Sequence, residues 1–342
     1  MGGEKIGVWL PSPMGDAILA TPALRAIRKG FGDAHIYFIS NGTVRQVLAS
    51  GGFNNEWIEI DGNVFKNGMK LRSHRLDQVI LFKNSFSAGL AALLSGAHRR
   101  IGYARDGRSW LLTHRIMPRR DSSGGFEPIS MVDYYLTIAS EVGCAAQDKT
   151  LELTVHEQDV LSMSGKLPQL VAGEGPTVIL VPGGSFGPSK LWPVARFGEL
   201  ANRLINECGA TVAVSIAPNK AEKKLAAQMC ATNRRLINLC DYRLPLGELK
   251  AVFGAADLVI TNDTGPRHLA AALGCKVVSL FGPNDPRWTR TGYGGEIQVV
   301  GQAECVPCDK PRCSQDRHIC MESITVEMVW TAARKFLKAD QS

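Results

Sequence analysis

The stretch ITNDTGPRHLAAALG (260–274) joins an apolar strand to an alanine-rich helix through a strongly polar turn. A plain connection between a strand and a helix needs no such residues. This turn places an acid, a hydroxyl, a glycine, an arginine and an imidazole at a helix start, where free backbone N–H groups favour anions, phosphate above all. The stretch therefore predicts a strand–turn–helix unit of an α/β fold that binds a phosphorylated ligand.

The rest of the chain repeats this unit in two halves. The apolar runs IGVWL, HIYFIS, WIEI and QVILF alternate with helical segments, the first predicted over 16–29, and the rhythm restarts at TVILVPGG (177–184). A last helix is predicted over 326–337. Apolar strands that alternate with helices indicate parallel sheets covered on both faces. We therefore predict an α/β fold of two Rossmann-like domains facing one another across a cleft.

The predicted domains are residues 1–170 and 171–342, because the glycine- and proline-rich segment 165–176 is typical of a linker. A length of 342 residues suits two domains. The net charge of +7 suits an anionic substrate or an acidic membrane surface, and no aromatic–basic ladder suggests nucleic acid. No apolar run is long enough for a signal peptide or a membrane span, so we expect a cytoplasmic protein with peripheral membrane contact at most.

The loop PSPMGDAILATPALRAIRK (11–29) follows the first strand and carries Asp16. One interpretation is that Asp16 caps the helix that begins there. The other is that Asp16 is a general base. The loop contains no GxGxxG pattern, so a nicotinamide site is not expected on this half.

The loop VPGGSFGPSK (181–190) combines three glycines with hydroxyls and a lysine. Gly183, Gly184 and Gly187 let backbone amides approach a ligand closely, and Lys190 adds a point charge. The loop is not a Walker A motif, so ATP hydrolysis is not expected. Because this loop and the 263–268 turn follow strands of the same predicted sheet, together they predict a diphosphate site. On its own, His268 is more typical of a satisfied buried histidine.

The chain contains no two aspartates separated by one residue, the pair with which many sugar-nucleotide enzymes clamp a diphosphate through a metal ion. Backbone dipoles and basic side chains would then have to stabilise a departing diphosphate. No catalytic metal or other cofactor is expected.

Three segments, PSPMGDAILATPALRAIR, PGGSFGPSKLWPVARF and TNDTGPRHLAAALGCKVVSLFGPNDP, resemble the family 9 glycosyltransferases, the ADP-heptose:lipopolysaccharide heptosyltransferases. The resemblance runs in the same order from about residue 5 to residue 290, and SFGPSKLWP is most similar to the heptosyltransferase II branch. It implies a GT-B fold with an acceptor-binding N-terminal domain and a C-terminal domain that binds the nucleotide sugar.

The resemblance also implies residue roles. Asp16 would be the base that deprotonates the acceptor hydroxyl, with inversion at the sugar, and Lys190 would act on the departing diphosphate. The implied donor-binding residues are Gly184, Ser185, Lys190, Glu222 or Asn219, Asp263, Thr264, Gly265 and His268. Pro266 and Arg267 depart from the family pattern, and the extra cation of Arg267 would either tighten diphosphate binding or alter which sugar is accepted.

The acceptor of this family is a phosphorylated, Kdo-containing lipid A, which is strongly anionic. The segment NVFKNGMKLRSHR (63–75) is predicted to be a flexible basic loop that closes over it. The candidate acceptor-binding residues are Lys66, Lys70, Arg72, Arg75 and Arg120. The alternative interpretation is solvated surface charge.

The segment CVPCDKPRCSQDRHIC (305–320) spaces four thiols as C-x2-C-x4-C-x6-C. Such clusters in cytosolic proteins suggest zinc more than disulfides, so Cys305, Cys308, Cys313 and Cys320 are candidates for a structural zinc site. Free or redox-variable thiols are the alternative. The other five cysteines, which are Cys144, Cys208, Cys230, Cys240 and Cys275, are predicted to be reduced core residues.

These observations predict an inverting heptosyltransferase of lipopolysaccharide core assembly with ADP-heptose as the donor. The enzyme is expected to act at the inner face of the cytoplasmic membrane. One alternative is a GT-B-like sugar-nucleotide epimerase, which would need no basic acceptor loop. Others are a family 9 transferase with a different sugar donor or acceptor, and a nucleotide-sugar-binding module without turnover.

Overall fold

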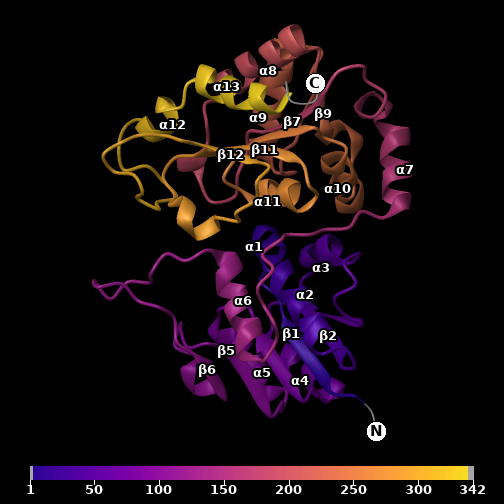
Figure 1. Cartoon of the computed structure of the whole chain (residues 1–342), viewed down its shortest axis with the longest axis vertical. Helices are drawn as coiled ribbons and strands as arrows, with labels where there is room; N and C mark the ends of the chain where they lie inside the picture. Colours follow the sequence, from indigo (N-terminus) through magenta and orange to yellow (C-terminus); the bar gives the residue numbers. More distant parts are fainter. Residues whose placement is uncertain (1–2, 338–342) are drawn as a thin grey trace. The chain divides into compact units, whose positions relative to one another are not determined.

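The computed structural model describes residues 3–337 and divides into two compact units (Figure 1). Unit 1 comprises Met1–Leu153 and Arg287–Gly292, and unit 2 comprises Thr154–Pro286 and Tyr293–Ser342. The chain therefore returns once to unit 1 after entering unit 2. The division after Leu153 lies earlier than the predicted 170/171 boundary, because helix α7 (Glu157–Lys166) is bound to unit 2 by an ion pair of 2.6 Å between Lys166 and Glu248.

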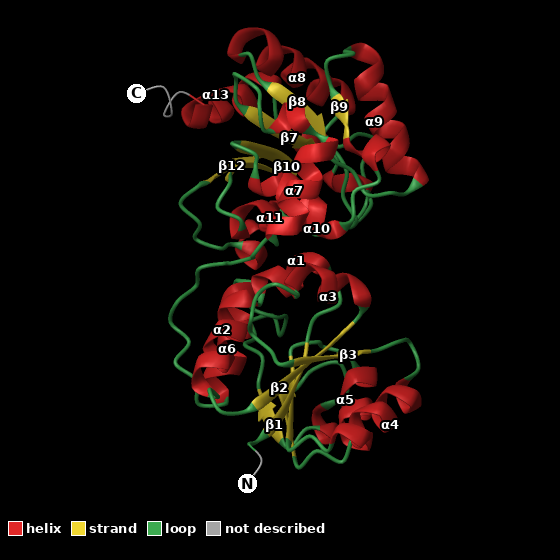
Figure 2. Ribbon diagram, turned by 90° about the vertical axis from the view of Figure 1, so that its right-hand side faces the viewer, coloured by secondary structure: helices red, strands yellow, loops and turns green. Residues whose placement is uncertain are grey.

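Unit 1 is built on a six-stranded parallel sheet in the order β3-β2-β1-β4-β5-β6. Its strands are β1 (Lys5–Trp9), β2 (His35–Ser40), β3 (Glu56–Glu59), β4 (Gln78–Leu81), β5 (Arg99–Tyr103) and β6 (His114–Ile116). Its helices are α1 (Met14–Leu19), α2 (Thr21–Gly30), α3 (Gly42–Leu48), α4 (Val64–His74), α5 (Phe86–Leu94) and α6 (Met131–Glu141), with a 3-10 turn, η1, at Ser109–Leu111. Figure 2 shows α2 and α6 on one side of this sheet and α4 and α5 on the other.

Unit 2 repeats the architecture with a parallel sheet in the order β12-β11-β10-β7-β8-β9. Its strands are β7 (Thr177–Val181), β8 (Thr211–Val214), β9 (Ile237–Asn238), β10 (Leu258–Asn262), β11 (Lys276–Phe281) and β12 (Glu296–Val300). The remaining helices are α8 (Val194–Cys208), α9 (Lys220–Thr232), α10 (Leu246–Gly254), α11 (Gly265–Ala272), α12 (Ile319–Ser323) and α13 (Val326–Leu337). Short 3-10 turns are η2 (Pro168–Leu170), η3 (Pro188–Lys190), η4 (Leu239–Tyr242) and η5 (Pro286–Thr289).

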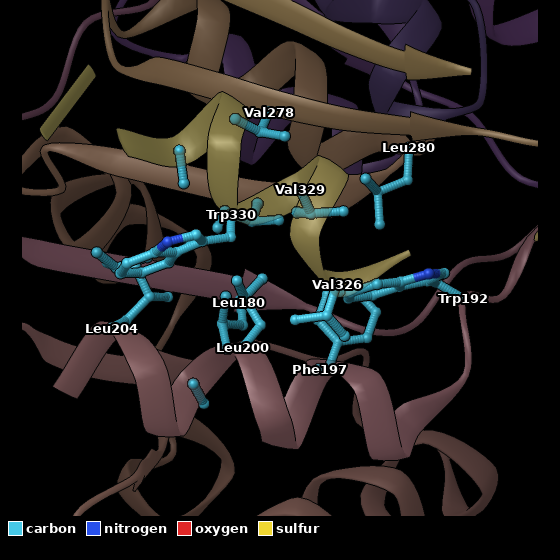
Figure 3. Packing of buried hydrophobic residues seen from close by; sticks show 14 of the residues in the cluster. Leu180, Trp192, Phe197, Leu200, Leu204, Val278, Leu280, Val326, Val329 and Trp330 are labelled. Atoms are coloured by element: carbon cyan, nitrogen blue, oxygen red, sulfur yellow. The ribbon is translucent and has the colours of Figure 1, made fainter. Parts of the chain in front are cut away.

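One hydrophobic core of unit 2 lies where α8 and α13 pack against one face of its sheet (Figure 3). Leu200 of α8 and Val329 and Trp330 of α13 point toward the strand residues Leu180 and Val278. All five side chains are buried. Truncating such a leucine to alanine costs about 2–5 kcal/mol, so this face holds the closing helix in place.

In both units the strand order reverses direction beside the first strand, between β1 and β4 and between β7 and β10. Loops that follow neighbouring strands on either side of such a switch point diverge and leave room for a ligand at the carboxyl edge of the sheet. The turn after β1 carries Asp16, the loop after β7 carries Lys190 and the turn after β10 carries Asp263. The fold therefore puts the predicted loops of each unit at its switch point.

The single helix predicted over 16–29 is wrong, because the structure has two helices separated at Ala20. Pro22 has no N–H with which to bond the carbonyl of Ile18, four residues earlier. That carbonyl accepts a hydrogen bond of 2.8 Å from the Thr21 hydroxyl instead. The predicted helix over 326–337 is confirmed as α13. Within residues 3–337, no helix is long and apolar enough to cross a membrane.

Candidate active site

The glycine loop after β7 brings two other segments into the site. A Cβ added to Gly183 would lie 1.9 Å from Oε2 of Glu222, and one added to Gly184 would lie 2.7 Å from Cγ2 of Thr264. A larger residue would have to displace those side chains, so glycine at both positions lets the loop pass close beside them. Glu222 accepts a hydrogen bond of 2.9 Å from the Ala217 N–H, which fixes its carboxylate beside the loop. The predicted donor residues Gly184, Glu222 and Thr264 are thus brought together.

A buried network of four charges lies under this loop. Lys190 Nζ donates to the carbonyl oxygen and to Oδ2 of Asp263, both at 3.0 Å. Arg267 contacts Oδ1 of Asp263 at 3.1 Å and pairs with both carboxylate oxygens of Glu296, at 2.5 and 3.0 Å. Burial alone would raise the pKa of Asp263, but Lys190 and Arg267 outweigh it and lower that pKa. Two cations and two anions balance, so the network is stable without a ligand.

Lys190 keeps one donor for a ligand. An ammonium group has three N–H donors, and two of them serve Asp263. The Phe186 ring lies over the ammonium group, with its centroid 4.6 Å from Nζ. Ser185, on the same loop, is exposed.

Arg267 does not contribute to ligand binding in the way the sequence suggested. Its side chain is only 1% exposed and is fully engaged by Asp263 and Glu296, so the prediction of an extra cation for the diphosphate is wrong. Glu296 was missed because its pairing depends on the parallel register of β11 and β12. That register sets Glu296 where Ser279 donates to it at 2.6 Å. Arg267 is therefore a positioning residue for Asp263.

Helix α11 begins at Gly265 without a side-chain cap, and the Thr264 hydroxyl lies instead near the Asn262 carbonyl oxygen at 3.3 Å. Pro266 has no N–H and the Arg267 N–H donates to the Thr264 carbonyl oxygen at 3.0 Å, so among the first three residues of α11 the Gly265 N–H is the donor that can reach a ligand. His268, on the same helix, is 4% exposed, and its Nδ1 has no hydrogen-bond partner among residues 3–337. Burial lowers the pKa of His268 to about 3, so the ring is neutral at pH 7.

Asp16 of unit 1 is not a helix cap. The N-cap position of α1 is Pro13, and Asp16 lies inside the first turn. Within the described chain, its carboxylate makes no hydrogen bond or ion pair. Burial raises the pKa of Asp16 to about 6, and its charge adds to the burial that raises the pKa of Tyr135. A carboxylate without a protein partner and with a raised pKa is suited to accept a proton.

Lys83 lies next to this loop and was missed from the sequence. It follows β4, which pairs with β1, and its Nζ donates to the Ser12 hydroxyl at 2.7 Å. Burial lowers the pKa of Lys83. The buried Arg108 holds the same strand end, donating to the Lys83 carbonyl and, at 2.8 Å, to Oδ1 of Asn84. The signal available in the sequence was a lysine directly after an apolar strand at the switch point.

A family model described as glycosyltransferase family 9 (heptosyltransferase) matches residues 64–319, well over half of the chain. The chain belongs to glycosyltransferase family 9. It is 26% identical to lipooligosaccharide heptosyltransferase 2 of Campylobacter jejuni over 98% of both chains. It is 27% identical to lipopolysaccharide heptosyltransferase 2 of Escherichia coli K12 over 83% of this chain and 84% of that one.

Solved structures bear out the fold of this glycosyltransferase. The E. coli ADP-heptose lipopolysaccharide heptosyltransferase II superposes with a TM-score of 0.80 at 23% identity, covering 99% of this chain and 100% of that chain. A family 9 glycosyltransferase from Veillonella parvula also gives 0.80, at 20% identity, covering 99% of each chain. The GT-B class, with its two Rossmann-like domains, is confirmed.

The predicted acceptor-binding residues of the glycosyltransferase lie on two separate elements of unit 1. Segment 63–75 is the helix α4, so the prediction of a flexible loop is wrong. Asn63 caps this helix by accepting from the Lys66 N–H at 3.0 Å, and Leu71 is buried beneath it. Lys66 pairs with Asp61 at 2.9 Å and Lys70 donates to the Glu59 carbonyl oxygen at 2.7 Å.

Arg72 and Arg75 lie at the end of α4, with Arg75 as its left-handed C-cap. Arg120 belongs instead to a hairpin in which residues 120 and 126 form an antiparallel bridge. Its guanidinium carbon lies 5.0 Å from the centroid of the Phe126 ring. The structure thus places four of the five predicted acceptor residues on or at the end of α4 and Arg120 on a separate hairpin.

The cysteine segment packs against the glycine loop that follows β7. Ser189 Oγ donates to the Lys310 carbonyl at 2.6 Å, and a Cβ added to Gly187 would lie 2.2 Å from the Pro311 carbonyl oxygen. Cys305, Cys308 and Cys313 lie near enough to Cys320 to add to the burial that raises its pKa.

All four thiols of this segment are free. Among residues 3–337, no three His, Cys, Asp or Glu side chains are arranged to hold a metal ion. A structural zinc ion stays a prediction from the sequence, which metal analysis of the reduced protein tests. Of the five cysteines predicted to lie in the core, Cys144 and Cys275 are buried and the other three are half-buried.

Proposed function

We propose that the protein transfers a heptose from ADP-heptose to the inner core of lipopolysaccharide, with inversion at the anomeric carbon. The observation that carries this proposal is Asp16, a carboxylate without a protein partner whose pKa is raised to about 6, at the switch point of unit 1. A protein that bound a nucleotide sugar without turnover would not need such a base. Family membership favours transfer over the epimerase alternative.

In the proposed reaction, Asp16 takes the proton of an acceptor hydroxyl while that oxygen attacks the anomeric carbon of the donor. The bond from the anomeric carbon to the β-phosphate oxygen breaks, and ADP leaves with the electron pair. General-base assistance of this kind contributes about 10²–10⁴-fold to the rate. The sugar keeps its heptose identity and changes only its anomeric configuration.

The departing diphosphate would be held by unit 2. The Gly265 N–H at the start of α11, the amides of the glycine loop and the remaining donor of Lys190 all favour negative charge there. Ser185, Gly184 and Gly265 would contribute short hydrogen bonds. Glu222, Thr264 and the neutral His268 would contact the sugar or the nucleoside, while Asp263 orients Lys190. This arrangement calls for no metal ion.

We propose a phosphorylated Kdo-lipid A as the acceptor and peripheral contact with the inner face of the cytoplasmic membrane. Helix α4 supports the membrane contact, because Phe65 and Met69 are 68% and 64% exposed, one helical turn apart. The exposed lysines Lys66 and Lys70 form a neighbouring row, about 100° further around the helix. An apolar stripe edged by lysines is typical of a helix that lies at an anionic lipid surface. No nucleic-acid partner is proposed.

The test is ADP release from ADP-heptose with Kdo₂-lipid A and its mono-heptosylated form offered separately. We expect release with the mono-heptosylated acceptor, as for heptosyltransferase II, and its loss in Asp16→Asn. Release without any acceptor, or an epimerised nucleotide sugar, would replace the transferase proposal with hydrolysis or epimerisation. Binding of ADP-heptose without turnover under every condition would leave only a binding module.

A further inference from the structure

A long loop of unit 2 has no part in the proposed reaction. Residues 301–318, all of which the structure describes, connect β12 to α12 without a helix or strand and include most of the cysteine segment (305–320). Loops longer than about 12–15 residues are uncommon in compact domains and are usually either functional or disordered. Hydrogen bonds hold this loop against unit 2 at several points, so its length points to a function.

The two ends of the loop are fixed to the sheet and to the start of α8. At the first end, the Gly301 N–H donates to the carbonyl oxygen of Phe281, the last residue of β11, at 2.8 Å. Just after α12, the Ile324 carbonyl oxygen accepts a hydrogen bond of 2.8 Å from Nε1 of Trp192. Trp192 is buried and lies directly after the glycine loop, so the chain beyond the cysteine segment is already joined to that loop.

The middle of the cysteine segment is anchored to the turn that follows β11. The N–H groups of Cys308 and Asp309 both donate to the Pro283 carbonyl oxygen at 2.9 Å. Oδ1 of Asp309 in turn accepts a hydrogen bond of 3.1 Å from the Asp285 N–H. Asp309 has a φ of 49°, a left-handed conformation that aspartate and asparagine adopt more readily than other side chains. Asp309 is therefore held through both its backbone and its carboxylate.

The next two residues of the segment meet the glycine loop. The Lys310 carbonyl accepts the hydroxyl of Ser189, and the Pro311 carbonyl accepts the Ser189 N–H at 3.4 Å. The Pro311 carbonyl also lies against Gly187. Because Ser189 is only 3% exposed and its hydroxyl is engaged, this serine serves the segment and not a ligand.

These contacts act on the part of the loop that carries Lys190. The two ends of the loop are held by Asn262, whose Nδ2 donates to the carbonyls of Pro182 and Gly183 at 3.0 and 3.2 Å. Oδ1 of Asn262 accepts from the Trp192 N–H at 3.3 Å. Between these ends, the cysteine segment holds the residue immediately before Lys190. A displacement of about 1 Å in such a loop is enough to misalign the groups that meet a ligand.

We propose that the cysteine segment is the positioning element of the diphosphate-binding loop. Residues 310–311 hold Ser189 and Gly187 in place and thereby set where the loop amides and Lys190 meet the donor. Asp309 is a positioning residue that acts through the segment and touches no donor group. The proposal rests on the proposed function, because it assumes that this loop binds the diphosphate of ADP-heptose.

The experiment measures the binding of ADP to the full chain by calorimetry. Ser189→Ala removes the contact with Lys310, and Asp309→Ala removes the contact with the turn after β11. Asp309→Asn keeps Oδ1 and tolerates the left-handed conformation, so it is the conservative variant. Ser164→Ala is the matched control, because it removes a hydroxyl of α7 that donates to a backbone carbonyl at 2.9 Å away from the loop. Circular dichroism and thermal melts establish that each variant is folded.

We expect the Kd of ADP to rise about 3- to 10-fold in Ser189→Ala and in Asp309→Ala, the effect of one lost hydrogen bond. Asp309→Asn and Ser164→Ala should bind ADP as the wild type does. The donor KM should rise by the same factor, and the acceptor KM should stay unchanged. In the free protein, hydrogen exchange of the amides of residues 183–190 should be faster in the two alanine variants that loosen the loop.

A segment that only stabilised the fold would give a different result. Lower melting temperatures with an unchanged Kd of ADP in folded Ser189→Ala and Asp309→Ala overturn the proposal. Asp309→Asn that binds ADP as weakly as Asp309→Ala also overturns it, because the effect would then come from the lost charge and not from the position of the loop.

Failure of the proposed function would be distinguishable. If ADP binds and the alanine variants weaken it, but no heptose is transferred, the positioning role is retained and the transferase reaction is lost. If heptose is transferred and the variants bind ADP normally, the positioning role alone is wrong. A wild type that binds no ADP would remove the donor site and the positioning role together.

Discussion

The two switch points of this molecule share one topology, but they shift the pKa of their carboxylates in opposite directions. In unit 1, Asp16 has no protein partner and its pKa is raised to about 6. In unit 2, Asp263 is held between Lys190 and Arg267, and its pKa is lowered. The fold places both acids at the carboxyl edge of a parallel sheet, but the neighbouring side chains decide whether an acid can move a proton or serves as a fixed charge.

The contrast extends to the lysines beside the two acids. Lys190 donates directly to Asp263, whereas Lys83 of unit 1 donates to the Ser12 hydroxyl. A lysine bonded to Asp16 would have lowered the pKa of that acid and removed its use as a base. The side chains of unit 1 therefore keep the cation near the loop and away from the acid.

The largest effect is expected from removing the unpaired acid. Asp16→Asn should lower kcat about 10²–10⁴-fold, because the acceptor hydroxyl loses its base. The donor KM should not change, since the donor loops lie in unit 2. Steady-state ADP release measures both constants, with the exposed Asp33→Asn as a matched control. Full activity in Asp16→Asn would mean that another group takes the proton.

The corresponding substitution in unit 2, Asp263→Asn, should mainly lower the free energy of unfolding. Asp263→Asn leaves two buried cations facing one remaining acid, and breaking a buried pair costs about 3–5 kcal/mol. Because the pKa of Asp263 is lowered in the fold, its contribution is present above its unfolded pKa and is lost as the pH falls. Urea-induced unfolding at pH 7 measures the effect. A decrease in the free energy of unfolding below about 1 kcal/mol would show that the ion pairs of Asp263 contribute no more than exposed ones do.

Local sequence signals predicted the sheets, the closing helix and the loops at the switch points, because each rests on residues that are adjacent in the chain. The features that were missed depend on distant pairings. Glu296 reaches Arg267 only through the register of β11 and β12, and Lys83 reaches Ser12 only because β4 pairs with β1. The prediction of a loop at 63–75 rested on the basic residues alone, whereas the signals of helix α4 are the Asn63 cap and the buried Leu71.

A smaller effect is expected from the lysine that supports the unit 1 loop. Lys83→Met should lower kcat about 10-fold, because Ser12 loses the contact that fixes the approach to α1 and Asp16 shifts slightly from its working position. Donor KM should be unchanged. Lys29→Met, an exposed lysine on α2, is the matched control. Equal kcat values for the two variants would show that the contact with Ser12 does not position Asp16.

The smallest effect compares the stability of Asp16→Asn with that of wild type across pH. The pKa of Asp16 rises from 3.8 to about 6 on folding, so the folded state holds this proton more tightly than the unfolded chain. Its stabilising contribution is complete below pH 3.8 and is lost as the pH rises through 6. The full shift would equal about 3 kcal/mol, and partial exposure of the residue reduces it to about 1–2 kcal/mol.

Thermal melts at pH 4 and pH 8 separate this contribution from others. At pH 8 we expect Asp16→Asn to melt about 2–6 °C above wild type, because it removes a poorly solvated charge, and at pH 4 the two should nearly coincide. The variant that loses the most activity would then be the more stable protein, as expected where a site keeps an acid without a partner for chemistry. Equal melting temperatures at pH 8 would mean that water solvates Asp16 fully. The two switch points would then differ only in that Asp263 is paired with cations.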